Sequence, residues 1–475
     1  MKKIIISALA SIALLTSCRE EGLLDKTPGN TVSQDQLDDM IASFPERAFV
    51  VTQGFEAGNN KYLIQSNTNG FSAHDDFGYM SILLATEHMT NDFVMARNHW
   101  FSTYYMFLAR NVENSRTRMV WNFYYKVVYN MNNILKFTTG DLDDQTRWLK
   151  GRSLAMRGLA YMDLVRLYGV GDQGIPYYSQ TINETGRVAT STVLQYVEND
   201  LLEAYDLLEG YQRGDKQSIN RNVVAGFLAR LYMTKGEYAK AAKYANMARQ
   251  GYTPMPATRL MDGFDEISNP EWMWGADIDG ATTTIYASFF SHIGNKNKGY
   301  AGLLGVYRNI DSRLYDKIAD TDLRKQWFLG QATDGLPKYA NVKFVDATFF
   351  LGDYVFMRAG EMYFIEAEAL ARSGNEAGAR AVLAEIMSVR DTAYVASINS
   401  GEALLEEINV NKRIELWGEG QNFYDMKRLG QDLARDYTGS NHSSIGKFNI
   451  SASDKRLIFQ IPQAELDANS NVSNP

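Results

Sequence analysis

The residue types that most often perform chemistry are scattered along this chain rather than grouped. The five histidines are an example, because no two of them lie within four residues of each other, as a local zinc pair would require. They are His74, His88, His99, His292 and His442. No Gly-x-Ser-x-Gly nucleophile motif and no phosphate-binding loop occurs. The sequence favours single, partly buried histidines over a metal site assembled from distant ones.

Two patterns match chemical motifs but lack the surroundings that those motifs need. Gly169-x-Gly171-x-x-Gly174 matches a dinucleotide fingerprint, which requires a strand before it and a helix after it. Here a helical pattern precedes the glycines and none follows, so the segment predicts a turn. Glu366 and Glu368 could form a glycosidase pair by type, but residues two apart on a helix point in different directions. We therefore predict no catalytic residues, no cofactor and no enzyme activity.

Aromatic side chains are abundant, with 28 Tyr, 23 Phe and 7 Trp. A ring that is exposed in a loop can stack on the face of a sugar or pack against a peptide side chain. Trp272 and Trp274 alternate like one face of a short strand, so we expect them in the core. Four other rings lie in irregular, polar stretches, where the sequence allows a ligand contact or a packed loop anchor: Trp100, Tyr286, Tyr300 and Trp327.

The N-terminal residues have the pattern of an export signal. A positive start, Met1-Lys2-Lys3, precedes about a dozen mostly apolar residues at 4–15, too few to span a bilayer as a helix. Leu15-Thr16-Ser17-Cys18 then resembles a bacterial lipobox, in which the cysteine is lipidated and becomes the first mature residue. The alternative is an ordinary secretory signal with an incidental cysteine. We predict a signal peptide at 1–17, lipidation of Cys18 and a tether at 18–35.

Composition narrows the possible partners. The 475 residues have a formal net charge of −8, and an acidic chain is a poor phosphate binder, so we expect no nucleic-acid partner. Cys18 is the only cysteine, so no disulfide can form within the chain.

The residues after Cys18, Arg19-Glu20-Glu21, resemble a short signal for surface display. We predict a protein that is lipid-anchored in the outer membrane and faces the cell exterior.

Periodic apolar residues predict the helices that must position any site. Apolar or aromatic residues at 121, 124, 125 and 128 recur at steps of three and four, as on one face of a helix. The same spacing runs over 154–168 and stops at a glycine. It returns over 193–208, where Ser191 or Thr192 is the expected N-cap.

Two helix–glycine–helix units are the clearest organisation. At 222–250, an apolar stripe ends at Gly236 and a stripe of small alanines follows, which lets two helices lie close together. At 355–390, the same arrangement surrounds Gly374. In each unit, alanines stand three and five residues after the glycine. Such units are typical of tetratricopeptide-like helical hairpins that stack side by side.

Periodicity fades before and between these units, where glycines and aromatics dominate. Long irregular segments are uncommon unless they bind something. We therefore predict a single domain at 36–475. Its helical-repeat scaffold occupies about 120–250 and 355–435, and its variable ligand-binding region occupies about 50–118 and 255–350.

The last hundred residues contain the most specific pattern. Lys412-Arg413-Ile414-Glu415-Leu416-Trp417-Gly418-Glu419-Gly420, followed by Phe423-Tyr424-Asp425-Met426-Lys427-Arg428-Leu429-Gly430, resembles the C-terminal signature of the SusD/RagB nutrient-binding outer-membrane lipoproteins. Segments at 358–374 and 457–466 resemble that family too, and shorter similarities occur at 129–135, 157–161, 200–204 and 269–271. Because charged and apolar residues alternate in the signature, we expect partly buried ion pairs that fix the packing of the last helices.

This resemblance implies a mainly α fold, a SusD-like α-α superhelix of tetratricopeptide-like helical hairpins with an irregular, loop-rich ligand-binding region. It also implies capture of an oligosaccharide, or in some members an oligopeptide, for a SusC-like TonB-dependent outer-membrane transporter. Binding residues form no fixed motif in the family, so only the loops at about 70–105 and 280–330 carry over. From them we select six candidate ligand-binding residues: Asn91, Asp92, Trp100, Tyr286, Tyr300 and Trp327.

Three functions remain open on the sequence. A glycan-binding surface lipoprotein fits the lipidation signal, the helical repeats and the aromatic loops. An oligopeptide-binding lipoprotein would keep the fold and change the ligand. A pure scaffold is the third, because tetratricopeptide-like units usually bind proteins. An enzyme fits least well, since no catalytic set is present.

Overall fold

A computed structural model describes residues 33–44, 47–65, 73–108 and 111–474. The predicted signal peptide and Cys18 lie outside these residues. By its packing the chain divides within α3 (Ala48–Tyr62) into units 1–52 and 53–475, whereas the sequence placed the start of the folded domain at residue 36. In the first unit, α2 (Gln34–Ser43) begins with a capping box in which Ser33 and Gln36 exchange hydrogen bonds.

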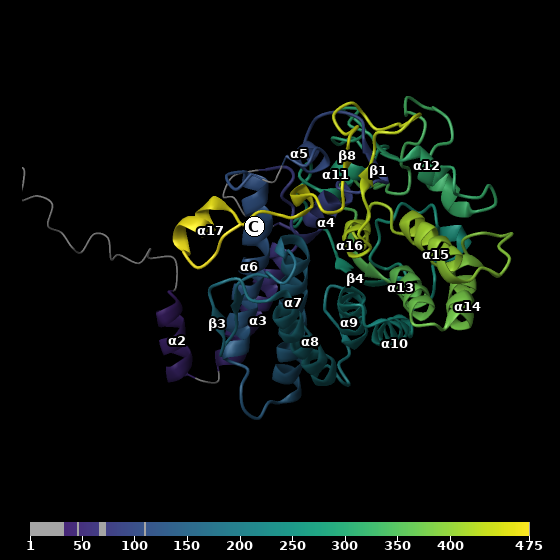
Figure 1. Cartoon of the computed structure of the whole chain (residues 1–475). Coiled ribbons are helices and arrows are strands. Elements are labelled where there is room, and N and C mark those ends of the chain that lie inside the picture. Colours follow the sequence, from purple (N-terminus) through teal and green to yellow (C-terminus); the bar gives the residue numbers. More distant parts are fainter. Residues whose placement is uncertain (1–32, 45–46, 66–72, 109–110, 475) are drawn as a thin grey trace, which may run out of the picture. The chain divides into compact units, whose positions relative to one another are not determined.

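Long helices form the scaffold of the second unit, and each packs on its successor along the chain (Figure 1). The helix at 238–249 packs on the helix at 359–372, so the array continues across the irregular residues between them. This arrangement confirms the mainly α fold with tetratricopeptide-like hairpins. The helices of the array are α6 (Ser115–Lys136), α7 (Asp144–Tyr168), α8 (Thr190–Leu207), α9 (Arg221–Lys235), α10 (Tyr238–Arg249), α13 (Ala359–Arg372), α14 (Glu376–Met387) and α15 (Gly401–Glu415).

The hairpin of α9 and α10 shows how the sequence produces this packing. The Asn220 side chain caps α9 by accepting a hydrogen bond from the Val223 N–H at 3.1 Å. Gly236 ends the helix in the left-handed region, with φ of 73°, where glycine has no Cβ to clash. On α10 the alanines at 241, 242, 245 and 248 are buried, so short side chains allow a close approach to α9 and α13.

The glycine-rich segment after α7 is the predicted turn. Gly169 caps α7, and the backbones of Val170 and Gln173 hydrogen-bond to each other across the turn. The next helix, α8, begins at Thr190, and its N-cap is Ala189, which provides no side-chain hydrogen bond. The predicted Ser191 or Thr192 cap is therefore wrong, because the helix starts two or three residues earlier.

The strands of the described residues form short antiparallel pairs. β1 (Phe93–Met95) pairs with β5 (Arg308–Ile310) and so joins two loops that lie far apart in the sequence. Trp272 and Trp274 lie on β4 (Trp272–Ala276) and are buried, which confirms their predicted place in the core. The other pairs are β4 with β6 (Tyr354–Arg358), β2 (Tyr177–Tyr178) with β3 (Asn183–Glu184), and β7 (Leu433–Ala434) with β8 (Asn449–Ile450).

The region that the sequence presented as irregular contains α4 (Tyr79–Glu87). All nine residues of α4 are buried, and a helix that is covered on every side has no amphipathic period to detect. Short helices complete the second unit: α5 (Ser102–Tyr105), η2 (Ala257–Arg259), α11 (Phe289–Ile293), α12 (Ser312–Tyr315), η3 (Leu323–Trp327), α16 (Asn422–Arg428), η4 (Lys455–Leu457) and α17 (Gln463–Ala468).

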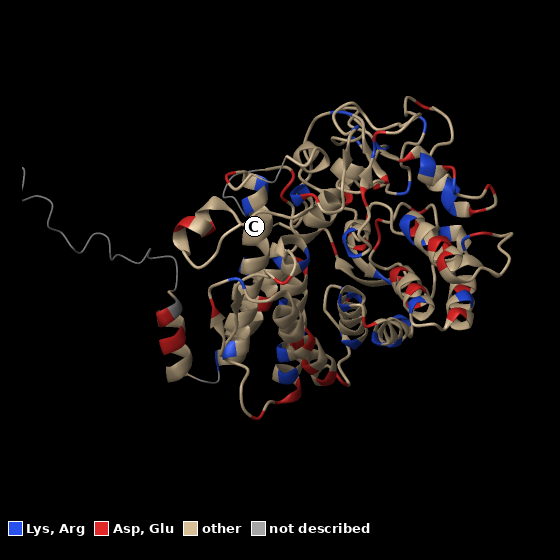
Figure 2. Cartoon of the chain, viewed as in Figure 1, with Lys and Arg blue, Asp and Glu red and all other residues tan. Residues whose placement is uncertain are grey.

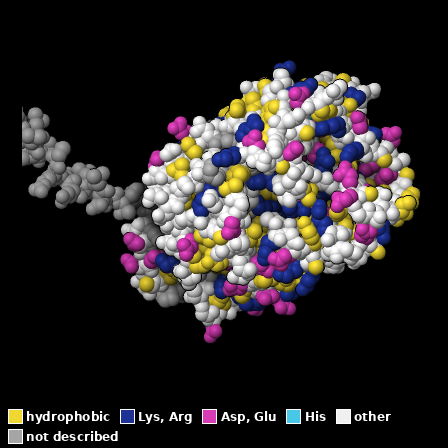
Figure 3. All heavy atoms as spheres, in the orientation of Figure 1, with side chains coloured by type: hydrophobic (Ala, Val, Ile, Leu, Met, Phe, Trp, Pro, Cys, Tyr) yellow, Lys and Arg dark blue, Asp and Glu magenta, His cyan; other side chains and the backbone are white. Residues whose placement is uncertain are grey.

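Charges of both signs occur on α14 and α15 (Figure 2), whereas α8 carries only acidic residues and α9 and α10 carry only basic ones. The face in Figure 3 shows the same mixture, with hydrophobic atoms in small separate patches. Within the described residues, none of the helices combines the length and apolar character needed to cross a membrane.

Candidate functional site

Three of the six predicted ligand-binding residues meet at one place. The Trp100 ring lies 6.4 Å from the Tyr300 ring, and the Tyr300 ring lies 6.3 Å from that of Tyr286, all between ring centroids. Phe350 lies 5.6 Å from Tyr286, and Phe349 lies 5.1 Å from Phe350. We call these five rings, together with His74, the aromatic platform.

Five loops supply the platform, and short elements adjoin each loop. Trp100 lies between β1 and α5, and His74 precedes α4. Tyr286 precedes α11, Tyr300 follows it, and the phenylalanine pair at 349–350 precedes β6. Residues that are far apart in the sequence therefore converge because β1 pairs with β5 and α11 packs on α4.

Two histidines, His74 and His292, hold the Tyr300 ring in place. The Tyr300 hydroxyl and His74 Nδ1 are joined by a 2.6 Å hydrogen bond, and His292 Nε2 lies 2.6 Å from the His74 carbonyl oxygen, to which it donates. The buried His292 ring stacks on Tyr300 at 4.9 Å. Burial holds the pKa of His292 well below its usual value, so this ring is neutral at physiological pH. Tyr300 is therefore held at its hydroxyl and on one face.

Trp100 is held from two sides. Its indole stacks on His74 at 5.7 Å, and the Arg116 guanidinium carbon lies 5.5 Å from its ring centroid. Arg116 itself donates two hydrogen bonds, of 2.8 and 3.0 Å, to the Asp75 carboxylate. The indole is thus restrained while part of its surface stays accessible.

Backbone strain and exposure concentrate on the platform. Of the eight described non-glycine residues with positive φ, four belong to the platform or are adjacent in sequence to one of its rings: Phe101, Ile285, Phe349 and Phe350. Bulky residues rarely adopt such angles, and strain of this kind clusters at functional sites. Tyr286 is 41% exposed and Phe349 is 57% exposed. Large rings held open to solvent on a rigid base are suited to stacking on a flat ligand face.

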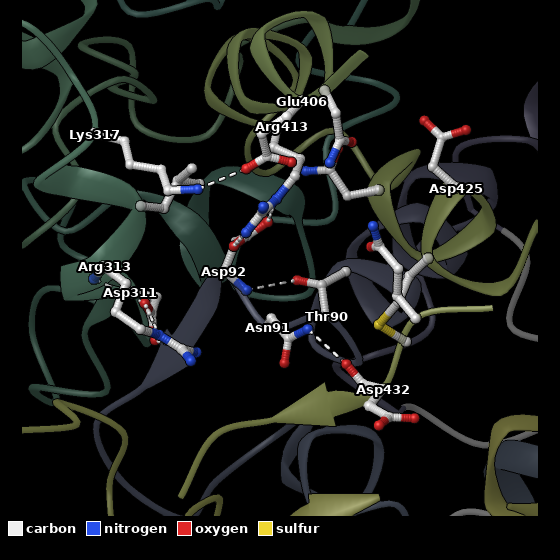
Figure 4. A pocket seen from close by; sticks show the side chains of 15 residues that line it. Thr90, Asn91, Asp92, Asp311, Arg313, Lys317, Glu406, Arg413, Asp425 and Asp432 are labelled. Atoms are coloured by element: carbon white, nitrogen blue, oxygen red, sulfur yellow. Dashed lines mark hydrogen bonds and ion pairs between the residues drawn. The ribbon is translucent and has the colours of Figure 1, made fainter. Parts of the chain in front are cut away.

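Asn91 and Asp92 lie elsewhere, in a polar cavity of about 300 Å³ (Figure 4). The Asp92 carboxylate accepts a 2.8 Å hydrogen bond from Arg413 Nε, and its backbone oxygen accepts one from the Trp417 indole. Asn91 donates to the Asp432 carbonyl oxygen at 3.0 Å and accepts from the Ala434 N–H. Both side chains are occupied by bonds that hold the C-terminal segments.

The remaining charges of the polar cavity also have partners. Lys317 and Glu406 form a 2.8 Å ion pair on its rim. Burial opposes ionisation of Asp311, but hydrogen bonds from His442 and Arg313 lower the pKa of its carboxyl to about 2. These charged side chains of the polar cavity are therefore engaged by other protein groups, whereas rings of the aromatic platform are open to solvent.

The structure argues against Trp327 as a ligand-binding residue. Its side chain is fully buried, and its indole N–H donates a 2.7 Å hydrogen bond to the Leu260 carbonyl oxygen. Phe264 packs edge-to-face on it, and the Lys343 ammonium lies 4.7 Å from its ring centroid. Trp327 is a packed loop anchor, because a ring without exposed surface cannot stack on a ligand.

Sequence reasoning missed His74, Arg116 and the phenylalanine pair as parts of the platform. The pair Phe349-Phe350 lies within the predicted ligand-binding region at 255–350 but outside the loop at 280–330 from which we selected residues, although two adjacent rings in an irregular segment were a usable signal. His74 and Arg116 gave no such signal, because their role depends on contacts made only in the fold.

The C-terminal signature forms a buried ion-pair network, as predicted. Glu415 accepts hydrogen bonds from Arg324, Arg358 and Arg390 at 2.6 to 3.1 Å. Arg358 also binds Glu419 at 2.7 Å. Burial opposes ionisation, but the three guanidinium groups hold the pKa of Glu415 well below its usual value. The network comprises Glu271, Asp322, Arg324, Lys343, Arg358, Arg390, Glu415 and Glu419.

The carboxylates at 366 and 368 belong to similar structural pairs. Glu366 binds Arg249 at 2.6 Å, and Glu368 binds Arg372 and Arg428 at 2.8 and 2.7 Å. Among the described residues, no group of three or more His, Cys, Asp or Glu side chains is arranged to hold a metal ion.

Family comparisons agree with this architecture. A model described as the SusD family matches residues 335–475, and a model described as starch-binding associating with outer membrane matches residues 52–233. SusD-like protein P2 of Formosa agariphila is 22% identical over 422 residues, which cover 76% of this chain and 81% of that protein. The chain belongs to the SusD family.

Solved structures share the fold over most of their length. A SusD-like carbohydrate binding protein from Bacteroides vulgatus has a TM-score of 0.78 at 25% identity, covering 89% of this chain and 97% of that chain. A SusD superfamily protein from Bacteroides thetaiotaomicron has a TM-score of 0.75 at 22% identity, covering 89% and 99%. A laminarin-binding SusD-like protein has a TM-score of 0.69 at 18% identity, covering 89% and 99%.

Proposed function

We propose that this protein is a cell-surface lipoprotein that binds oligosaccharides on the aromatic platform and delivers them, without catalysis, to a SusC-like TonB-dependent outer-membrane transporter. The observation that supports binding at this place is the convergence of five loops. They present Trp100, Tyr286 and Tyr300 together, with large rings open to solvent. Exposed apolar rings are costly without a partner, so a site that maintains them is expected to serve a ligand.

The chemistry of the platform favours a sugar. The exposed rings offer flat faces for the apolar side of a sugar, and tyrosine adds a hydroxyl at its edge. Because the histidines beneath already fix Tyr300 and Trp100, little side-chain freedom remains to be lost on binding. The family description as starch-binding, and the relatives named for carbohydrate and laminarin binding, support the same class of ligand.

Anchoring and delivery rest on the N-terminus and on the family. The family description associates these proteins with the outer membrane. Lipidation of Cys18 would tether the mature chain there, and outward display would place the platform where glycans arrive. The mass of the mature N-terminal peptide tests the anchor, and copurification with a TonB-dependent transporter tests the partnership.

Calorimetric titration of residues 19–475 tests the binding function. The ligands are a panel of neutral oligosaccharides and, separately, a mixed peptide pool. We expect saturable binding of a glycan that is lost in Trp100→Ala and in Tyr300→Ala, because stacking requires the rings. Binding of peptides alone would replace this proposal with peptide capture. Binding of neither class, together with stable association with a transporter, would favour a protein-binding scaffold.

A further inference from the structure

A second cavity, of about 530 Å³, lies beside the loop that carries Tyr300. Its volume falls within the range of small-ligand sites. One wall is aliphatic and aromatic, formed by Leu303, Leu329, Leu336 and Tyr307. Leu303 is 66% exposed, although it belongs to a turn closed by a 2.9 Å hydrogen bond from its N–H to the Gly299 carbonyl oxygen. This wall presents apolar surface that the fold itself leaves open.

The lining of this cavity also includes two cations that are not neutralised within the described residues. Lys296 and Lys298 line the cavity and are exposed, and neither forms an ion pair or hydrogen bond with any residue in the described part of the chain. The one carboxylate among the lining residues is Asp334, at the tip of a hairpin turn that Thr333 and Leu336 close by mutual backbone hydrogen bonds. In a chain of net charge −8, unpaired cations gathered around one hollow are a local exception.

A third cation reaches the same place from the other loop. The Ala96 N–H donates to the Tyr307 carbonyl oxygen at 3.0 Å, which extends the β1–β5 pairing to the residue before Arg97. The Arg97 guanidinium carbon lies 3.8 Å from the position that a Cβ would take on Gly305, and the Tyr307 ring lies 3.7 Å from the same point. Arg97 is exposed and has no ion-pair partner among the described residues.

The cavity and the aromatic platform share these two loops. One loop supplies Trp100 to the platform and Arg97 beside the cavity, and the other supplies Tyr300 to the platform and Leu303 to the cavity. The Cα atoms of Tyr300 and Leu303 are three residues apart, so they are separated by at most about 11 Å. A ligand that lies on the rings and extends along the second loop therefore reaches the basic cavity.

We propose that this cavity is a subsite for an anionic group, a carboxylate or a sulfate, on the glycan that the platform binds. The inference rests on the proposed function and narrows its substrate class to charged glycans. The aliphatic wall covers the sugar ring, while Lys296, Lys298 and Arg97 attract the anion. Because these cations lie at a solvent-exposed rim, their contribution is sensitive to salt.

Pairs of oligosaccharides that share a sugar backbone and differ in charge separate the contribution of the anionic group from that of the sugar. Oligogalacturonate and its methyl ester share one backbone and differ in the carboxylate charge, and a sulfated carrageenan oligosaccharide and its desulfated form differ in sulfate. We expect the charged member of at least one pair to bind residues 19–475 at least fivefold more tightly, with a preference that shrinks as salt rises. The pair that shows this preference identifies the source of the anion.

Variants locate the effect. We expect K296Q/K298Q to lower affinity for the charged probe about fivefold to tenfold and to leave its uncharged partner unchanged. The matched control K240Q/K243Q removes two exposed lysines from α10 and is expected to change neither. Equal binding within both pairs, no binding of any of the four probes, or equal effects of the two double variants would overturn the subsite. The proposed function would survive those results if a neutral glycan still binds and is lost in Trp100→Ala.

Discussion

The ion-pair network and the aromatic platform belong to the same unit but keep their side chains in opposite conditions. In the network, the Arg358 and Glu415 side chains are 1% and 0% exposed, and each charge meets an opposite one. On the platform, Tyr286 and Phe349 leave large rings open to solvent, and several neighbouring residues have positive φ. The charges of the network neutralise one another, whereas the platform retains apolar surface that a ligand could cover. The contrast supports our proposal that the network fixes the fold and that the platform binds the ligand.

The largest expected effect comes from breaking the network. Glu415→Gln removes the carboxylate that Arg324, Arg358 and Arg390 share. We expect the free energy of unfolding to fall by about 3–5 kcal/mol, because buried guanidinium charges lose their counterion. Denaturant unfolding measures this loss, and the glycan affinity of the folded fraction should remain within about twofold.

A surface pair provides the control for that experiment. Arg456 and Asp454 form a 2.8 Å ion pair in which the arginine side chain is 47% exposed. We expect Arg456→Gln to change the free energy of unfolding by at most about 1 kcal/mol. Equal effects of Glu415→Gln and Arg456→Gln would contradict the structural role of the network.

Glu87 offers a second comparison with the network, because it is a buried carboxyl that has no cation partner in the part of the chain that the structure describes. Burial raises the pKa of Glu87 to about 8, against hydrogen bonds from the Gly420 N–H and the Asn422 side chain. The raised pKa means that the stability contributed by this group is complete below pH 4.5. It is lost progressively as pH rises toward 8, since folding must hold the proton that the unfolded chain releases.

Glu87→Gln mimics the protonated carboxyl and should remove this pH dependence. We expect the variant to exceed the natural protein in free energy of unfolding by about 3 kcal/mol at pH 7 and to equal it near pH 4.5. The Asn422 Oδ1 atom, which is buried without a partner, can accept from the new amide if Asn422 rotates. Parallel stability curves from pH 4.5 to 8 would contradict the raised pKa.

On the platform, Trp100→Ala is expected to have the largest effect on binding. Loss of a central stacking ring should cost about 2 kcal/mol of binding free energy, a roughly thirtyfold rise in Kd for the tightest glycan of the panel. Trp327→Phe is the control, because it alters a tryptophan that is buried in the core. Trp327→Phe should lower the free energy of unfolding and leave Kd unchanged. A rise in Kd for Trp327→Phe, with none for Trp100→Ala, would contradict ligand binding on the platform.

The outer rings should contribute least. Tyr286→Ala and Phe349→Ala each remove an exposed ring at the edge of the platform. We expect Kd to rise about fivefold for each, with little change in the free energy of unfolding, because exposed rings contribute little to packing. Calorimetry and denaturant unfolding on the same samples measure both quantities. A loss of stability without a loss of affinity would make these rings structural.

Periodic elements could be predicted from the sequence, because their signal is local. The stripes of α9 and α10 and the glycine between them defined a hairpin without knowledge of its neighbours. The alternation of charged and apolar residues around Glu415 likewise predicted buried ion pairs. The helix α4 could not be predicted in this way, because burial on all sides removes the amphipathic pattern.

The candidate site could be predicted only in part. Irregular, polar surroundings were enough to select Trp100, Tyr286 and Tyr300, but the same surroundings selected Trp327, which the fold buries. Whether a loop ring is open or packed depends on what lies above it, and that is decided by tertiary contacts. Asn91 and Asp92 were chosen by region alone, and their side chains bind C-terminal residues more than 300 positions away.

The central claim is that the ligand lies on the aromatic platform rather than in the polar cavity. A crystal structure of residues 19–475 with the tightest oligosaccharide of the panel tests it most directly. The account predicts electron density for a sugar ring against Trp100 and Tyr300, with the network unchanged. A sugar bound beside Asp92 and Arg413, with the platform empty, would contradict it.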